Sequence, residues 1–180
     1  NITLTRCRIS TISQYYSPTA NTKMTGWKIN KCYISDISLS AVNLVLQNWE
    51  VINNIFIGSI SMDNTNNVNN LIRNNVIKGA INLYIAYFSN NCISASSFTT
   101  VNVTVKNNIS NSNSLPAGNG NLNNQPDAIV FQGLTGNSTD GQWRLAAGSP
   151  AIGAGETISS ITPDCGAYGT ADPYVLSGIP

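Results

Sequence analysis

Short apolar runs separated by polar clusters characterise most of the chain. The runs are rich in Ile, Val, Thr, Tyr and Phe, and clusters of Asn, Ser and Gly separate them. They predict β-strands, because β-branched and aromatic side chains pack well on a pleated surface. The sequence contains no capped amphipathic segment with the 3.6-residue period of a helix. The pattern therefore predicts an all-β fold.

One six-residue pattern recurs along the chain. It consists of an apolar residue, a polar residue, a pair that is usually Asn-Asn, and one or two apolar residues, and its clearest copies are Ile72–Ile77 and Phe88–Ile93. Aligned on the second residue of the pair, six copies form one column: Cys7, Cys32, Ile55, Asn75, Asn91 and Asn108. The steps between successive members of this column are 25, 23, 20, 16 and 17 residues.

Irregular steps of this size predict a coil whose strands stack in register while loops of different length leave its corners. Asn suits such a corner, because it tolerates the left-handed backbone of a tight bend and its amide can hydrogen-bond from turn to turn. We therefore expect a side-chain ladder of Asn75, Asn91 and Asn108, with Cys7 and Cys32 in the same column. The apolar residues two positions later should form an inward-facing column: Ile9, Ile34, Ile57, Ile77 and Ile93.

The composition indicates one globular domain that uses amides and hydroxyls for solubility. Charged residues make up only 9% of the 180 residues and hydrophobic residues 42%, which excludes a charge-rich disordered chain. The sequence holds 27 Asn and 20 Ser, and no Asn follows Asn137, so the chain has two compositional parts. A net charge of +1 with scattered Lys and Arg argues against nucleic acid as a partner. The longest apolar stretch, near Leu83 to Phe88, is far too short to span a membrane.

The repeated pattern resembles the bends of the pectate-lyase-like superfamily of right-handed parallel β-helices, over roughly residues 1 to 112. A second resemblance lies near the C-terminus. There Trp143–Gly155, which contains Gly-Ser-Pro-Ala-Ile, and Pro163–Gly169 are similar to the closing segment of many bacterial secreted β-helix proteins. Together these resemblances imply a right-handed parallel β-helix, or solenoid, from a secreted or cell-surface bacterial protein.

The expected organisation is a β-helix over residues 1–125 followed by a C-terminal cap over residues 126–180. The last turn of a solenoid exposes an apolar end and unpaired strand edges, which a cap has to cover. Four apolar residues of the closing segment are the expected plugs: Trp143, Leu145, Ile152 and Tyr168. Because residues 1–5 already resemble a strand within a repeat, we also expect further turns upstream.

The ionisable residues give little support for catalysis. Histidine is absent, which removes imidazole acid–base chemistry and every His-based nucleophile pair or metal site. A glycosidase needs two carboxylates about 5–10 Å apart. No two acids lie within five residues of each other, although successive turns of a coil can bring distant acids together. The chain also lacks the polygalacturonase motifs Asn-Thr-Asp, Asp-Asp, Gly-His-Gly and Arg-Ile-Lys.

Four residues are candidates for ligand binding, and each has a structural alternative. Asp36 and Asp63 are acids of the coil, either for a ligand or as solvated surface residues. Tyr33 and Trp49 either stack against a sugar at the surface or pack inside the coil, and for Trp49 we favour the interior. We assign no catalytic residue and no metal ligand.

Two functions remain open at this stage. The first is a non-catalytic secreted or cell-surface module, structural or adhesin-like, whose partners are polysaccharide or other surface proteins. The alternative is a polysaccharide lyase or glycoside hydrolase of the same superfamily, with its active turns partly outside this chain. Only the alternative would bring in a cofactor, which is calcium. Neither nucleic acid nor membrane insertion is expected, and the oligomeric state stays open.

The four cysteines are expected to be free thiols. Cys7 and Cys32 share the ladder column, where equivalent Cα atoms of stacked turns lie about 4.8 Å apart, close enough for a disulfide. Parallel side chains in register point the same way, however, which makes the required S–S torsion hard to reach. Cys92 and Cys165 lie far apart in the sequence, which gives no basis for pairing them.

Overall fold

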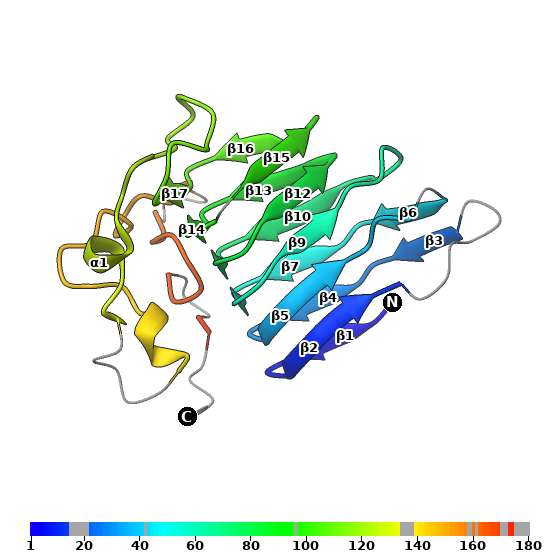
Figure 1. Cartoon of the computed structure of the whole chain (residues 1–180), viewed down its shortest axis with the longest axis horizontal. Coiled ribbons are helices and arrows are strands. Elements are labelled where there is room, and N and C mark those ends of the chain that lie inside the picture. Colours follow the sequence, from blue (N-terminus) through cyan, green and yellow to red (C-terminus); the bar gives the residue numbers. More distant parts are fainter. Residues whose placement is uncertain are drawn as a thin grey trace.

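The chain coils into a parallel β-solenoid of about five turns, as the computed structural model in Figure 1 shows. The structure describes residues 1–14, 22–41, 43–95, 97–133, 139–157, 160, 162–169 and 173–174. Short helical segments occur after the coil, namely α1 (Asp127–Val130) and a 3₁₀ turn at Gly141–Trp143. The predicted all-β fold with stacked parallel strands is confirmed.

The first sheet takes one short strand from each turn. Its strands pair in the order β1 (Thr3–Thr5), β4 (Lys28–Asn30), β7 (Glu50–Ile52), β10 (Asn70–Arg73), β13 (Ala86–Ser89) and β16 (Thr104–Lys106). Leu71 is in register with Tyr87, and Tyr87 with Thr104, so equivalent residues line up from turn to turn.

The second sheet covers the remaining sides of the coil. Its long strands β2 (Arg8–Ser13) and β5 (Tyr33–Ser38) pair with each other. On its other side β5 pairs with two shorter strands of the next turn, β8 (Ile55–Phe56) and β9 (Ile60–Met62). Later turns keep this division, with β11 (Val76–Ile77), β14 (Cys92–Ile93) and β17 (Ile109–Ser110) after β8, and β12 (Ile81–Tyr84) and β15 (Phe98–Val101) after β9. A separate pair is formed by β3 (Thr22–Thr25) and β6 (Leu44–Gln47).

The interior of the coil is a stack of apolar side chains. From the first sheet it receives an in-register column of Leu4, Ile29, Val51, Ile72, Phe88 and Val105. From the second sheet it receives Ile9, Ile34, Phe56, Ile77 and Ile93.

The predicted inward column is therefore wrong in its third turn. Ile57, which we expected there, is 42% exposed, and fully buried Phe56 takes its place. The pair that matches the other turns is Asn53–Asn54, so the sequence alignment had slipped by one residue. Because side chains alternate between the two faces of a strand, a slip of one residue moves the expected side chain to the outside.

The ladder at the first corner runs through Asn54, Asn75, Asn91, Asn108 and Asn121. In each step the backbone N–H and the side-chain N–H of one asparagine donate to Oδ1 of the next, at 2.9–3.1 Å. The structure thus brings together Asn75, Asn91 and Asn108 as expected, and adds the asparagines on either side of them. Since the ladder amides pair with one another from turn to turn, the ladder fixes the register of the turns.

Cysteines continue the same column in the first two turns. The backbone N–H of Cys7 donates to Sγ of Cys32 at 3.4 Å, and the backbone N–H of Cys32 donates to Oδ1 of Asn54 at 2.9 Å. Cys7, Cys32, Cys92 and Cys165 are all free thiols in the structure. Burial raises the pKa of Cys32 to about 11.

A second apolar cluster covers one outer side of the coil. The column Tyr33, Ile55, Val76, Cys92 and Ile109 packs against residues of the C-terminal segment, including Val130, Phe131, Trp143, Cys165 and Tyr174. The segment lies beside the stack of strands (Figure 1).

The expected plugs therefore need a correction. Trp143 is buried, but in the outer cluster, and Ile152 is 52% exposed. Leu115, from the segment directly after the last strand, joins the interior cluster of the coil. Cys92 and Cys165, which are far apart in the sequence, lie in the same outer cluster.

Candidate binding groove

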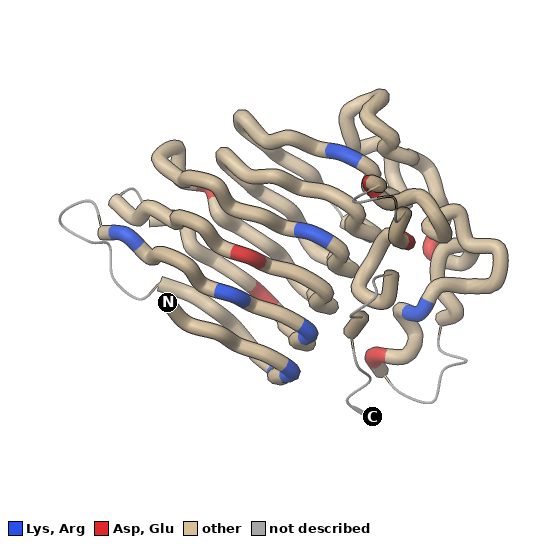
Figure 2. Tube along the Cα trace, turned by 180° about the vertical axis from the view of Figure 1, so that it is seen from behind, with Lys and Arg blue, Asp and Glu red and all other residues tan. Residues whose placement is uncertain are grey.

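The outer face of the first sheet carries polar, charged, aliphatic and aromatic side chains. One outward row contains Thr3, Lys28, Glu50, Leu71, Tyr87 and Thr104, in register from strand to strand. Lys28 and Glu50 form an ion pair at 3.1 Å, which is well exposed and therefore contributes little to stability. Charged positions are sparse along the turns (Figure 2).

A shallow groove of about 290 Å³ crosses this face over the last three strands of the first sheet. Three consecutive turns line it, each with equivalent positions: Asn69 and Leu71, Ile85 and Tyr87, Asn102 and Thr104. Asn70 and Ala86 complete the lining, although Ala86 packs against the interior cluster of the coil. The groove thus offers an aromatic ring, two aliphatic side chains and several amides, the mixture typical of ligand sites.

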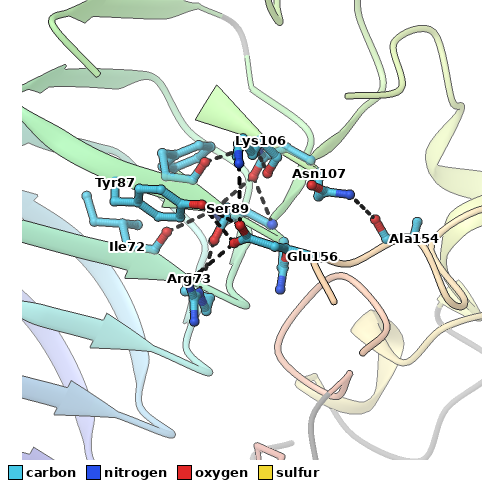
Figure 3. A network of polar contacts seen from close by, with 12 residues as sticks. Ile72, Arg73, Tyr87, Ser89, Lys106, Asn107, Ala154 and Glu156 are labelled. Atoms are coloured by element: carbon cyan, nitrogen blue, oxygen red, sulfur yellow. Dashed lines mark hydrogen bonds and ion pairs between the residues drawn. The ribbon is translucent and has the colours of Figure 1, made fainter. Parts of the chain in front are cut away.

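Tyr87 also belongs to a polar cluster at the edge of the groove, which is drawn in Figure 3. Its hydroxyl donates to the carboxylate of Glu156, with the two oxygens at 2.7 and 2.8 Å. Arg73 and Lys106 each form an ion pair with Glu156 at 3.5 Å. The Arg73 guanidinium also lies 5.6 Å from the centroid of the Tyr87 ring. One carboxylate from the C-terminal segment therefore pairs with both cations of this cluster.

The pKa of Tyr87 is raised to about 12. Burial is the largest cause, followed by the hydrogen bond to Glu156 and the negative charge of that residue, while Arg73 acts in the opposite direction. At neutral pH Tyr87 is therefore a protonated hydrogen-bond donor and a poor general base.

The first asparagine of three corner pairs contacts the C-terminal segment, and that of one pair, Asn90, contacts Glu156 itself. Asn74, Asn90 and Asn107 have left-handed backbones, with φ of 55°, 56° and 51°. Asn90 accepts a hydrogen bond from the backbone N–H of Glu156 at 2.7 Å, and Asn107 donates to the carbonyl of Ala154 at 3.1 Å. The side chains of the corner therefore fasten the C-terminal segment, whereas the next residues form the ladder inside.

A second hollow, of about 360 Å³, is less suited to a ligand. Its lining includes Lys78, Asp127, Phe131 and Trp143. The ammonium of Lys78 already lies 4.7 Å above the Trp143 ring, and Asp127 accepts a hydrogen bond from Ser94 at 2.7 Å. The ring face of Trp143 and the carboxylate of Asp127 thus already have partners within the protein.

The residues predicted to bind a ligand lie elsewhere. Trp49 is fully buried and stacks on Trp27 with ring centroids 4.9 Å apart, and Tyr33 is buried in the outer cluster, so neither ring can face a sugar. Asp36 accepts a hydrogen bond from the backbone N–H of Ser59 at 2.8 Å, a structural contact between turns. Asp63 lines a separate hollow of about 210 Å³ and accepts a hydrogen bond from Asn82 at 2.8 Å.

Sequence reasoning missed the groove and its edge. Tyr87 directly precedes the clear copy Phe88–Ile93, but the pattern does not say which aromatic residues face outward. The partner of Tyr87 is 69 residues away in the C-terminal segment, so no local signal links them. Glu156 directly follows Trp143–Gly155, and this nearness to the segment that resembles other β-helix proteins was the only signal available.

Comparisons with known proteins add no relative: no protein-family model, curated protein or solved structure matches the chain. Within the described residues no group of three or more Cys, Asp and Glu side chains is placed to hold a metal ion. The described part of the chain also has no helix long and apolar enough to cross a membrane. The functional proposal therefore rests on the fold and the groove.

Proposed function

We propose that the chain is a non-catalytic extracellular module that binds polysaccharide through the groove on its first sheet. On this proposal it is a right-handed β-helix of the pectate-lyase-like type, from a secreted or surface-attached bacterial protein. The observation that carries the proposal is the lining of the groove, which in the described part of the chain joins Tyr87, Leu71 and Ile85 to the amides of Asn69 and Asn102.

This lining matches the chemistry of sugars. A sugar ring presents C–H faces, which pack on aromatic and aliphatic side chains, and hydroxyl groups, which pair with amides. The groove lies on a sheet whose register is held by the asparagine ladder, so its residues are already ordered before a ligand binds. Such preorganisation lowers the entropic cost of binding.

The polar cluster beside the groove supports a non-catalytic role. Within the described residues the side-chain partners of Glu156 are two cations and a phenol, an arrangement that neutralises and orients the carboxylate, whereas glycoside hydrolysis uses a pair of acids. Arg73, Lys106 and Tyr87 are thus engaged in holding the C-terminal segment.

Affinity electrophoresis of the purified chain through gels that contain neutral or acidic polysaccharides tests the proposal. We expect retardation by at least one polysaccharide, and we expect Leu71→Ala to weaken binding about tenfold, because it removes a contact worth roughly 1.4 kcal/mol. Ile52→Ala is the matched control, since Ile52 is an outward aliphatic residue of the neighbouring strand outside the groove.

Two outcomes would contradict the proposal. Absence of retardation by every polysaccharide would remove the binding function. Release of new reducing ends or unsaturated products from any of them would favour a lyase or hydrolase instead.

A further inference from the structure

The second corner of the coil has a left-handed residue in each turn. In successive turns these are Gly26, Asn48, Asn69, Ile85 and Asn102, with φ between 48° and 69°. Glycine has no Cβ to clash in this conformation, and asparagine tolerates it better than other residues. Ile85, at φ 48°, does not fit the column.

Ile85 is the one β-branched residue with a positive φ in the described part of the chain. A β-branched side chain in this region of backbone space is a genuine outlier, because its Cβ substituents crowd the backbone. The turn holds the conformation through a hydrogen bond from the Ile85 backbone N–H to the carbonyl of Val101 at 3.0 Å. Asparagine, which both neighbouring turns carry, would satisfy the same backbone with less strain.

Core packing does not account for the isoleucine. Its side chain is only partly buried, and it belongs neither to the interior cluster nor to the outer cluster of apolar side chains. It lines the groove instead, between Asn69 and Asn102 and next to Leu71 and Tyr87. Strained residues that the fold does not need gather at functional sites.

We propose that Ile85 is a ligand-contacting residue that selects a neutral glycan carrying N-acetyl groups; this inference rests on the proposed polysaccharide binding. An acetamido group has a methyl group, which fits the aliphatic side chains of Ile85 and Leu71. It also has an amide N–H and C=O, which fit the side-chain amides of Asn69 and Asn102. Neutrality follows from the lining, in which the described residues carry no charge, and from Glu156, which already neutralises much of the charge of Arg73 and Lys106.

The test compares the wild-type chain with Ile85→Asn, which restores the residue type of the column. Calorimetric titrations with oligomers of N-acetylglucosamine and with cello-oligosaccharides of equal length compare ligands that differ at the acetamido group. We expect the wild type to prefer the acetylated oligomer, and Ile85→Asn to weaken that binding about tenfold or more. We also expect the melting temperature of Ile85→Asn to rise by roughly 2–4 °C, because the strain is relieved.

Ile57→Asn is the matched control, since Ile57 is exposed, lies outside the groove and has an ordinary backbone. We expect Ile57→Asn to change the binding and the melting temperature much less than Ile85→Asn does. Together, a higher melting temperature and lost binding in Ile85→Asn would distinguish a functional residue from a structural one.

Each contrary result has a distinct meaning. Equal binding of both oligomers by the wild type would overturn the selection of N-acetyl groups. A more stable Ile85→Asn that binds as the wild type does would overturn the role of Ile85 while leaving polysaccharide binding intact. A less stable variant would make Ile85 a packing residue and overturn the inference. A wild type that binds no saccharide would overturn the proposed function itself.

Discussion

The hydroxyl of Tyr87 lies 2.7 and 2.8 Å from the two carboxylate oxygens of Glu156, a residue 69 positions later in the chain. This contact joins the face of the first sheet to the C-terminal segment. It also places a protonated phenol at the edge of the groove, because Glu156 contributes to the raised pKa of Tyr87.

Removal of this hydroxyl should therefore weaken the protein. We expect Tyr87→Phe to lower the free energy of unfolding at neutral pH by about 1.5–3 kcal/mol, the range for a hydrogen bond to a charged group. Urea unfolding measures the change. Tyr84→Phe is the control, since Tyr84 is a partly buried tyrosine of β12 whose hydroxyl forms no hydrogen bond within the described residues. Equal effects of the two substitutions would contradict a specific role of the Glu156 contact.

The same contact predicts a pH dependence at high pH. A tyrosine in the unfolded chain has a pKa near 10, and Tyr87 in the folded chain has a pKa of about 12. Its contribution is thus fully present below pH ~10 and lost as the pH rises through about 12. We expect the stability of the wild type to fall more steeply in this window than that of Tyr87→Phe. Parallel unfolding curves across the window would contradict the raised pKa.

The buried ladder should be sensitive to loss of a single amide. Asn91 is fully buried, and its Oδ1 accepts from the backbone and the side chain of Asn75, while its own amide donates to Asn108. We expect Asn91→Leu to destabilise the chain by about 3 kcal/mol or more, since each unpaired buried group costs about 1–3 kcal/mol. A thermal or urea melt measures the loss. Asn113→Leu, at an exposed position, should have little effect, and an unchanged melt of Asn91→Leu would exclude a stabilising ladder.

The first corner offers a stabilising substitution. Arg6 has φ 54° in the turn position that asparagine occupies in Asn53, Asn74, Asn90 and Asn107. Relief of the left-handed strain in Arg6→Asn should raise the free energy of unfolding by about 1 kcal/mol. Arg8→Asn, in the extended strand β2, provides the control for the lost charge. If both variants melt alike, backbone strain at Arg6 is negligible.

Thiol chemistry should reflect the burial of the cysteines. Burial raises the pKa of Cys165 to about 12 and that of Cys92 well above its ordinary value. Because the thiolate is the reactive form, we expect both to resist alkylation in the folded chain near pH ~8. In denaturant without reductant, four thiols should react, and mass spectrometry of the alkylated chain counts them. Two reactive thiols would reveal a disulfide.

The repeated six-residue pattern was sufficient to predict the stacked parallel turns. The pair Asn74–Asn75 recurs as Asn90–Asn91, and the structure assigns the two members separate tasks, one outside and one inside the coil. The error at Ile57 arose because Ile55 was aligned with the ladder although Asn53–Asn54 stood beside it. In a short strand with apolar residues on both faces, hydrophobicity alone does not fix the register.

The outer cover and the groove could not be predicted in the same way. Adjacent apolar residues such as Val76 and Ile77 face opposite sides, and the outward one needs a cover that comes from a distant part of the chain. The groove depends on which outward side chains of three turns meet, and on the backbone angle of Ile85. Neither the outer cover nor the groove can therefore be predicted from the sequence pattern of a single turn.

The asparagine ladder keeps one geometry although its members are separated by 21, 16, 17 and 13 residues. The additional residues of the longer turns leave the coil at its corners, so they do not alter the spacing of the shared strands. Loop length and loop composition can therefore change in one turn without a compensating change in the next. For protein engineering, this makes each turn an independent site of insertion on a common rigid frame.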